Sequence, residues 1–233
     1  ISFGLYKTNI CLISPKSRGI WFEALNNFLK IKGEGIFGIN FSSDDFDDDY
    51  NNFVKNDLKL SNKIEICFEG NNEKQIKFSF FNILDKTIEG LNILVSYEMD
   101  FQNNIENSNN NVNKVNQLVI QTEVPDSLKD IFERKLGIRL ALDKTFKEWA
   151  GRMLFFRLGG VTLEVIEGKD IEQNTKYFGI GWHAENYNKC YNKLIDDGFS
   201  LSEIRKGRKE GTVVSTMKEP ILNIPTILIV LEE

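Results

Sequence analysis

Apolar and polar positions recur in a regular order through the second half of the chain. A run rich in β-branched residues at 115–122 predicts a strand, and apolar residues at helical spacing follow it. Asp126 or Ser127 is the expected N-cap of this helix, and Gly137 is its expected end. The predicted inner face of the helix consists of Leu128, Ile131, Phe132 and Leu136. Three more strands, expected at residues 138–142, 152–158 and 161–167, complete a βαβββ unit.

A second unit of the same kind follows directly. A strand is expected at 178–184, and then a helix that Asn186 caps and Gly198 ends. The residues predicted for the inner face of this helix are Tyr187, Cys190, Tyr191 and Leu194. Later strands are expected at 211–217 and 225–231. The pattern therefore predicts an α+β fold built from tandem βαβββ modules.

The chain also repeats itself at a fixed distance. Residues 38–46 align without gaps to residues 179–187, an offset of 179 − 38 = 141, and residues 19–25 align to 160–166 at the same offset. The second match places Glu23 on Glu164 and predicts a strand at 20–25. We therefore expect residues 19–58 to superpose on 160–199.

The repeat divides the chain into two homologous halves. Residues 1–101 form the first half, which opens with expected strands at 6–14 and 20–25 and lacks the initial βα part of its first module. Residues 102–113 are rich in asparagine and too polar to pack, so they are expected to be a linker. Residues 114–233 form the second half, with two βαβββ modules. We infer that a native N-terminal segment precedes the sequence, or that the first copy is shortened.

Composition and charge narrow the classes of protein. The net charge of −5 argues against nucleic acid as a partner. No run of about 18 apolar residues is present, so neither a membrane span nor membrane binding is expected. The three cysteines, Cys11, Cys67 and Cys190, are far apart and have no CxxC spacing. A cytoplasmic protein, either a monomer or a homodimer, is the expectation.

Three motifs carry a resemblance to a known superfamily. The strand motif at 116–120, the segment Lys135–Leu140 and the strand motif Thr162–Ile166 resemble the vicinal-oxygen-chelate (VOC) superfamily of glyoxalases, bleomycin-resistance proteins and extradiol dioxygenases. The resemblance is good over 114–233 and weaker over 1–101. It implies sheets curled into a cup with helices outside and a divalent metal ion, such as zinc, nickel, manganese or iron, on the concave face. The ligands of the metal would come from the first and last strands of each module.

Strand alternation identifies the residues that face this cup. Alternation puts Gln117, Glu164 and His183 on the cup face, and the resemblance implies that Gln117 holds the ligand position of a first strand and Glu164 that of a last strand. These three residues are the predicted metal ligands, and Glu164 and His183 are also the predicted proton-transfer residues. A solvated amide at Gln117 and a histidine at the rim of the cup remain open alternatives. Burial of the Glu164 carboxylate would be costly without an ion or a hydrogen-bonding partner.

The remaining ligand positions lack donors, and other polar residues are candidates for substrate binding. The resemblance places the ligand position of the next strand on Gly179 and the fourth position on Leu228. The residues predicted to bind an anionic substrate are Arg152, Arg208, Gln121 and Thr162. For Arg208, which lies in a cluster of basic residues, a solvated hairpin remains the alternative.

Two functions follow from the resemblance, and whether the chain is an enzyme stays open. The first is a glyoxalase-like, metal-assisted enzyme of the lyase, isomerase or dioxygenase type, acting on a small, oxygen-rich, anionic metabolite in the second cup. The second is a metal-free protein of the bleomycin-resistance type that binds or sequesters a small molecule. Glu164 and Gln117 favour the enzyme, whereas the gaps at Gly179 and Leu228 favour the binding protein.

Overall fold

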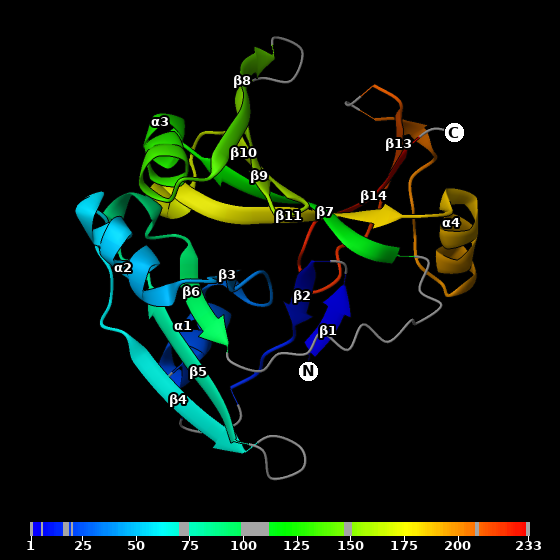
Figure 1. Cartoon of the computed structure of the whole chain (residues 1–233). Coiled ribbons are helices and arrows are strands. Elements are labelled where there is room, and N and C mark those ends of the chain that lie inside the picture. Colours follow the sequence, from blue (N-terminus) through cyan, green and yellow to red (C-terminus); the bar gives the residue numbers. More distant parts are fainter. Residues whose placement is uncertain are drawn as a thin grey trace.

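The structure is a computed structural model. It describes residues 2–5, 7–15, 19, 21–69, 75–98, 112–146, 151–207 and 210–231. The described strands form three sheets, of two, four and eight strands, and the predicted α+β fold of two halves is confirmed (Figure 1). The predicted linker lies outside the described residues up to position 111, and its last two residues, Val112 and Asn113, already belong to a strand.

The eight-stranded sheet belongs to the second half and contains both predicted modules. The strand order across it is β12-β13-β14-β11-β7-β10-β9-β8. Its two central strands, β7 and β11, are antiparallel, and each pairs in parallel with the last strand of its own module, β10 or β14. The bounds are β7 Val112–Thr122, β8 Arg139–Phe146, β9 Gly151–Leu158, β10 Val161–Glu167, β11 Thr175–Ala184, β12 Arg205–Lys206, β13 Thr212–Thr216 and β14 Thr226–Leu231.

Two helices cover the outer face of this sheet. Helix α3 (Pro125–Lys129) continues as a π-helical segment, Asp130–Lys135, and α4 spans Tyr187–Asp196 (Figure 1). Asn186 caps α4 as predicted, because its side chain accepts a hydrogen bond from the Lys189 N–H. The predicted cap of α3 was wrong: Val124 holds the N-cap position, and Pro125 starts the helix.

The first half contributes a four-stranded sheet with the order β3-β6-β5-β4 and a separate hairpin. Its elements are β1 Ser2–Leu5, β2 Thr8–Cys11, α1 Phe22–Lys32, β3 Gly38–Ser42, α2 Phe46–Lys55, β4 Ile64–Glu69, β5 Gln75–Asn82 and β6 Asn92–Glu98. The segment β3-α2-β4-β5-β6 is therefore a βαβββ module like those of the second half.

The repeat at offset 141 is confirmed for residues 38–55, where it extends to single hydrogen bonds. Helices α2 and α4 begin and end at positions that differ by 187 − 46 = 141 and 196 − 55 = 141. The Tyr50 hydroxyl donates to the Ser61 carbonyl oxygen at 3.2 Å, and the Tyr191 hydroxyl donates to the Ser202 carbonyl oxygen at 3.3 Å. Since 202 − 61 is also 141, the two copies lock the helix to the following loop in the same way.

The other aligned block was wrong. Residues 20–25 were expected to form a strand equivalent to β10, but helix α1 begins at Phe22, so Glu23 lies on a helix and Glu164 on a strand. Leu25 is the buried residue of α1, and Gly33, with a φ of 72°, ends it. The strand expected at 6–14 is present in part, as β2, which pairs with β1 in a hairpin. A short apolar segment fits either a strand or a helix, which explains the false match.

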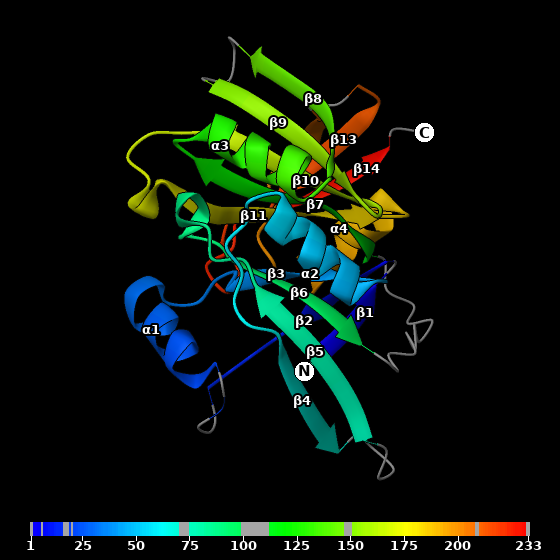
Figure 2. The same cartoon turned by 60° about the vertical axis from the view of Figure 1, so that its left-hand side comes forward.

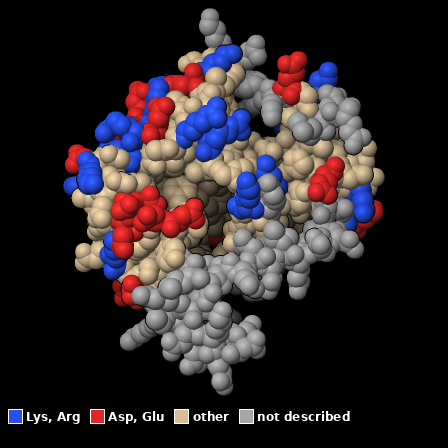
Figure 3. Space-filling view, viewed as in Figure 1, with Lys and Arg blue, Asp and Glu red and all other residues tan. Residues whose placement is uncertain are grey.

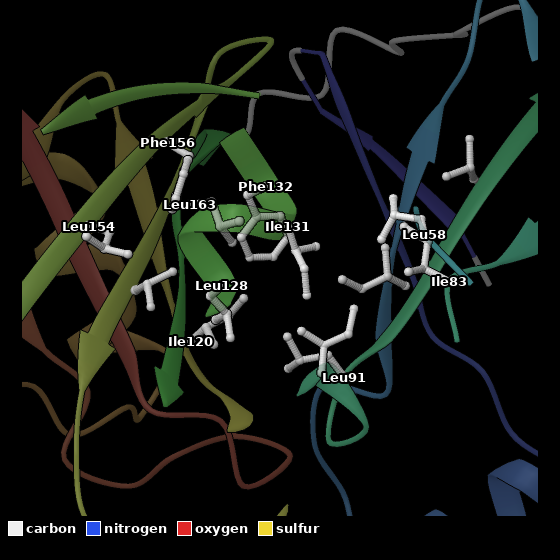
Figure 4. Packing of buried hydrophobic residues seen from close by; sticks show 14 of the residues in the cluster. Leu58, Ile83, Leu91, Ile120, Leu128, Ile131, Phe132, Leu154, Phe156 and Leu163 are labelled. Carbon is white, nitrogen blue, oxygen red and sulfur yellow. The ribbon is translucent and has the colours of Figure 1, made fainter. Parts of the chain in front are cut away.

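The two halves share one hydrophobic core. Under α3, the buried side chains include Ile131, Phe132 and Leu163, and the same cluster continues through Leu58 and Leu91 of the first half (Figure 4). Figure 2 shows α2 beside α3 at this junction. A second cluster lies under α4 and comprises Ala184, Tyr187, Cys190, Leu228 and Val230. Both helices therefore occupy one face of the eight-stranded sheet and leave the opposite face to form the cup.

Candidate functional site

The cup face carries a set of polar side chains on its central strands. On β7 and β10, Thr162 lies opposite Gln117 and Glu164 lies opposite Val119. Leu163 and Val165, which alternate with them, are 0% exposed beneath α3. Because neighbouring residues of a strand point to opposite faces, Gln117, Thr162 and Glu164 face away from the helices, as predicted.

Glu164 is the buried carboxylate of this face. It is 5% exposed and sits between Val119 on β7 and Phe155 on β9. A carboxylate at such a position is costly to keep ionised unless other groups stabilise it. This chemistry makes Glu164 the strongest candidate for a functional carboxylate in the cup.

The Gln117 side chain lies over the neighbouring strand β11, because the residue paired with it there is a glycine, Gly181. Gly181 on β11 pairs with Gln117, and a Cβ atom at Gly181 would lie 2.7 Å from the Gln117 Cγ atom. Any larger residue at position 181 would displace the Gln117 side chain. Gly181 therefore positions Gln117 over the floor of the cup.

His183 lies too far from Glu164 on the cup face to share a metal ion with it. On β11, Gly179 is level with Val119, and therefore with Glu164, whereas His183 lies four residues further on, opposite Lys114. With about 3.4 Å per residue and about 4.8 Å between strands, the Cα atoms of Glu164 and His183 are about 17 Å apart on a flat ladder. Two such side chains do not reach one ion through bonds of about 2 Å. The buried Nδ1 atom of His183 has no hydrogen-bond partner among the described residues.

The other ligand positions that the resemblance implies hold no donor atoms. Gly179 faces the cup. The expectation that the fourth ligand position falls on Leu228 was wrong, because Leu228 is 4% exposed and packs under α4. The cup-facing residues of β14 are Ile227, which pairs with Gly181, and Ile229. In the described part of the chain, no group of three His, Cys, Asp or Glu side chains could hold a metal ion. Gln117 and Glu164 alone do not fit the four-position metal centre implied by the resemblance.

Arg152 lies on the helix side of the sheet. It alternates with Met153 on β9, and its guanidinium donates to Asp143 at 2.7 and 2.8 Å and to Asp126 of α3 at 2.7 Å. The hydrogen bonds from Arg152 hold the pKa of the Asp143 carboxyl well below its usual range. Arg152 therefore stabilises the contact between the sheet and α3, and it does not face the cup, where it was predicted to bind an anionic substrate. The other predicted arginine, Arg208, lies outside the described residues.

Two other arginines, which sequence reasoning missed, face the cup. The Arg157 Nη1 atom donates to the Thr162 hydroxyl at 2.7 Å, and Arg139 on β8 lies directly opposite Arg157. The sequence did contain the signal for Arg157. Gly159 and Gly160, with φ values of 49° and 114°, form a two-residue turn that pairs Leu158 with Val161 and hence Arg157 with Thr162.

The ends of the cup differ in chemistry. The predicted substrate-binding residue Gln121 lies opposite Lys176 on β11 and Ile166 on β10. At the other end, the Arg205 guanidinium donates to the Thr216 hydroxyl at 3.0 Å, and Thr216 pairs with Ile227. Arginines from strands on both sides of the central pair β7–β11 therefore face the cup.

The outer surface has no single-signed character. Acidic and basic side chains are interspersed over the face shown in Figure 3, which has a hollow near its centre. None of the helices in the described part of the chain is long and apolar enough to span a membrane.

Comparison with known proteins identifies the fold. No family model matches the sequence, and no curated protein does. A variant of 4-hydroxymandelate synthase from Streptomyces coelicolor superposes with a TM-score of 0.66 at 10% identity, over 94% of this chain and 76% of that one. A hypothetical protein from Staphylococcus aureus gives a TM-score of 0.61 at 8% identity, over 92% of this chain and 75% of that one. Methylmalonyl-CoA epimerase from Mycobacterium tuberculosis matches 54% of this chain and 93% of its own, at 11% identity and a TM-score of 0.46. Together with the βαβββ modules and the cup, the two matches over more than 90% of the chain show that it has the fold of the vicinal-oxygen-chelate superfamily.

Proposed function

We propose that the cup of the second half binds a small, oxygen-rich, anionic molecule without a metal ion, as in binding proteins of the bleomycin-resistance type. The observation that carries this proposal is the composition of the four ligand positions. Gly179 and Ile227 supply no donor, and His183 is two strands and four residues from Glu164. A ligand in this cup would meet amide, hydroxyl and guanidinium groups rather than a metal ion.

Polar groups on the cup face support this role. Gln117 and Thr162 can donate or accept hydrogen bonds, and Gln121 offers a second amide further along β7. Apolar neighbours, among them Val119, Phe155 and Ile229, would bury the body of the ligand. A largely apolar concave surface with a few fixed polar groups is typical of small-molecule sites. We further propose a cytoplasmic monomer or homodimer, since the buried Cys190 thiol forms no disulfide.

A second candidate is an enzyme in which Glu164 moves a proton of the bound molecule. The observation that favours it is the burial of this carboxylate on the cup face beside Gln117. In the metal-assisted form of this hypothesis, Gln117 and Glu164 would be ligands and His183 would have to reach the same ion.

Metal content separates the metal-free binding protein from the metal-assisted form of the enzyme. We expect protein purified without a histidine tag to contain far less than an equimolar amount of zinc, nickel, manganese or iron by elemental analysis. Glu164→Gln is compared with Glu133→Gln, which removes the same charge from an exposed site on the helix side. An equimolar metal ion that only Glu164→Gln loses would refute the metal-free proposal in favour of the enzyme.

Binding to the cup is tested with catechol, a neutral molecule with two neighbouring oxygens. Saturation-transfer NMR should detect catechol on the wild-type protein. Gly181→Ala should weaken this signal, because its Cβ atom displaces the Gln117 side chain, while circular dichroism confirms the fold. Gly19→Ala, where a Cβ atom meets nothing within 4 Å, is the control. Equal catechol signals from all three proteins would contradict binding at this site.

A further inference from the structure

The described arginines fall into two groups according to the face on which they lie. On the helix side, each is paired with a carboxylate: Arg134 with Asp130 at 2.9 Å, and Arg152 with Asp143 and Asp126. These guanidinium groups have their charges balanced within the protein. They have no need of an external anion.

The arginines of the cup face have no carboxylate partner among the described residues. Arg157 donates to the Thr162 hydroxyl, and Arg205 donates to the hydroxyls of Thr216 and Ser202 at 3.0 and 3.3 Å. The side chain of Arg139 has neither a hydrogen bond nor an ion pair within the described part of the chain. These neutral contacts orient the side chains of Arg157 and Arg205 but supply no negative charge from the described residues.

Arg139 and Arg157 also lie directly opposite each other on adjacent strands. Like charges in such a pair destabilise a sheet unless a counter-charge lies between them. The ladder continues sideways from Arg157 to Thr162 and then to Gln117, at about 4.8 Å per strand. A small oxyanion over Thr162 would therefore be within reach of two guanidinium groups, a hydroxyl and an amide.

Building on the function proposed above, we propose that Arg157 and Arg139, with Thr162 and Gln117, bind the oxyanion of the ligand, either a carboxylate or a phosphate. The planar guanidinium fork of Arg157 is oriented by Thr162 and forms charge-assisted hydrogen bonds to two oxygens of this group. The body of the ligand then extends toward Phe155 and Glu164, which are the next cup-facing residues along β9 and β10. This site uses neither Arg152 nor Arg208.

The experiment compares three molecules that share a benzene ring: catechol, salicylate and phenyl phosphate. Their dissociation constants are measured by NMR titration on the wild type, Arg157→Gln and Arg134→Gln. Arg134→Gln removes the same charge from the helix side and serves as the matched control. Arg157→Lys keeps the positive charge but removes the planar guanidinium group that can donate two parallel hydrogen bonds. Circular dichroism verifies that each variant is folded.

We expect the wild type to bind salicylate, phenyl phosphate or both more tightly than catechol, and the preferred anion identifies the oxyanion class. Arg157→Gln should weaken binding of that anion by about tenfold or more, leave catechol within about twofold, and differ from Arg134→Gln. Arg157→Lys should recover only part of the loss.

Two outcomes would overturn the inference. If catechol binds at the cup but Arg157→Gln and Arg134→Gln weaken the anions equally, the oxyanion site is refuted while the binding function stands. If none of the three molecules binds the wild type, both proposals fail.

Discussion

At the scale of single residues, the position of an arginine along a strand decides its role. Arg152 and Arg157 are five positions apart on β9, so alternation sends them to opposite faces. Arg152 meets the aspartates beside α3, whereas Arg157 meets only the hydroxyl of Thr162. An electrostatic role in folding and a candidate role in binding therefore arise from one strand.

The ion pair of Asp143 should make stability depend on pH. Because hydrogen bonds from Arg152 lower the pKa of Asp143 in the folded state, its stabilising effect is complete above the unfolded pKa of about 3.9. The effect is lost as the pH falls toward the folded pKa. Asp143→Asn should lower the free energy of unfolding at pH 7 by about 1–3 kcal/mol, and by less at pH 3.

Urea unfolding at the two pH values measures this difference, with the exposed Asp44→Asn as the control. A cost of Asp143→Asn that is equal at pH 7 and pH 3 would show that the cost does not come from the ionised carboxylate, and a cost no larger than that of Asp44→Asn would show that the ion pair does not stabilise the fold.

At the scale of elements, the sequence predicted those segments whose pattern is local and periodic. The predicted strand at 161–167 has those bounds in the structure. Of the residues predicted for the inner face of the helix that follows β7, Leu128, Ile131 and Phe132 are buried and Leu136 is partly buried. The strand expected at 20–25 was wrong, because helix α1 begins at Phe22 and six residues do not distinguish the two periods.

Prediction of the candidate site failed where it depended on register between strands. Alternation placed Gln117 and Glu164 on one face, as observed. The distance of His183 from them depends on which residue of β11 is level with Glu164, and this residue is Gly179, four positions before His183. The register between strands that are far apart in sequence is not part of the local pattern, so convergence on one ion could not be tested from the sequence.

The duplicated tyrosine contact gives a test of the repeat. Tyr50→Phe and Tyr191→Phe each remove a hydrogen bond to a loop carbonyl, so each should cost about 0.5–1.5 kcal/mol of unfolding free energy. Since the two sites share no partner, the double variant should show the sum within about 0.5 kcal/mol.

Chemical denaturation of the single and double variants checks this prediction. The more exposed Tyr97→Phe is the control. If one substitution leaves the free energy of unfolding unchanged while the other lowers it, the two contacts are equivalent in geometry but not in energy.

At the scale of the whole molecule, the halves are joined by packing and by specific contacts. The Tyr177 hydroxyl donates to the Asn92 carbonyl oxygen at 3.0 Å, and the Asn56 side chain donates to the Lys135 carbonyl oxygen at 3.0 Å. The core cluster passes through both halves without a break. Cooperative unfolding of the two halves is therefore expected.

Gly90 is the position at which this junction is most sensitive. A Cβ atom there would overlap the carbonyl oxygen of Thr175, which is itself fully buried. Gly90→Ala must push the halves apart and should cost about 1–3 kcal/mol or more. Calorimetry should show one transition for the wild type and a lower Tm for the variant.

Gly19→Ala, which meets no neighbouring atom, is again the control for the junction. Two separate transitions in the wild type would mean that the shared core does not couple the halves. An unchanged Tm for Gly90→Ala would mean that the backbone around Thr175 can move to accommodate the Cβ atom without loss of stability.

The pairing of arginines by face also affects how fast a ligand arrives. The chain carries a net charge of −5, which would repel an anion at long range. On the helix side the arginine charges are cancelled by aspartates, whereas Arg157 and Arg205 on the cup face contact only hydroxyl groups among the described residues, so the arginines available to attract an anion at short range lie in the cup. Added salt, with a Debye length near 8 Å at about 0.15 M, screens the distant repulsion more than the attraction at contact. An anion should therefore find the cup of this acidic protein with little loss of association rate as ionic strength rises.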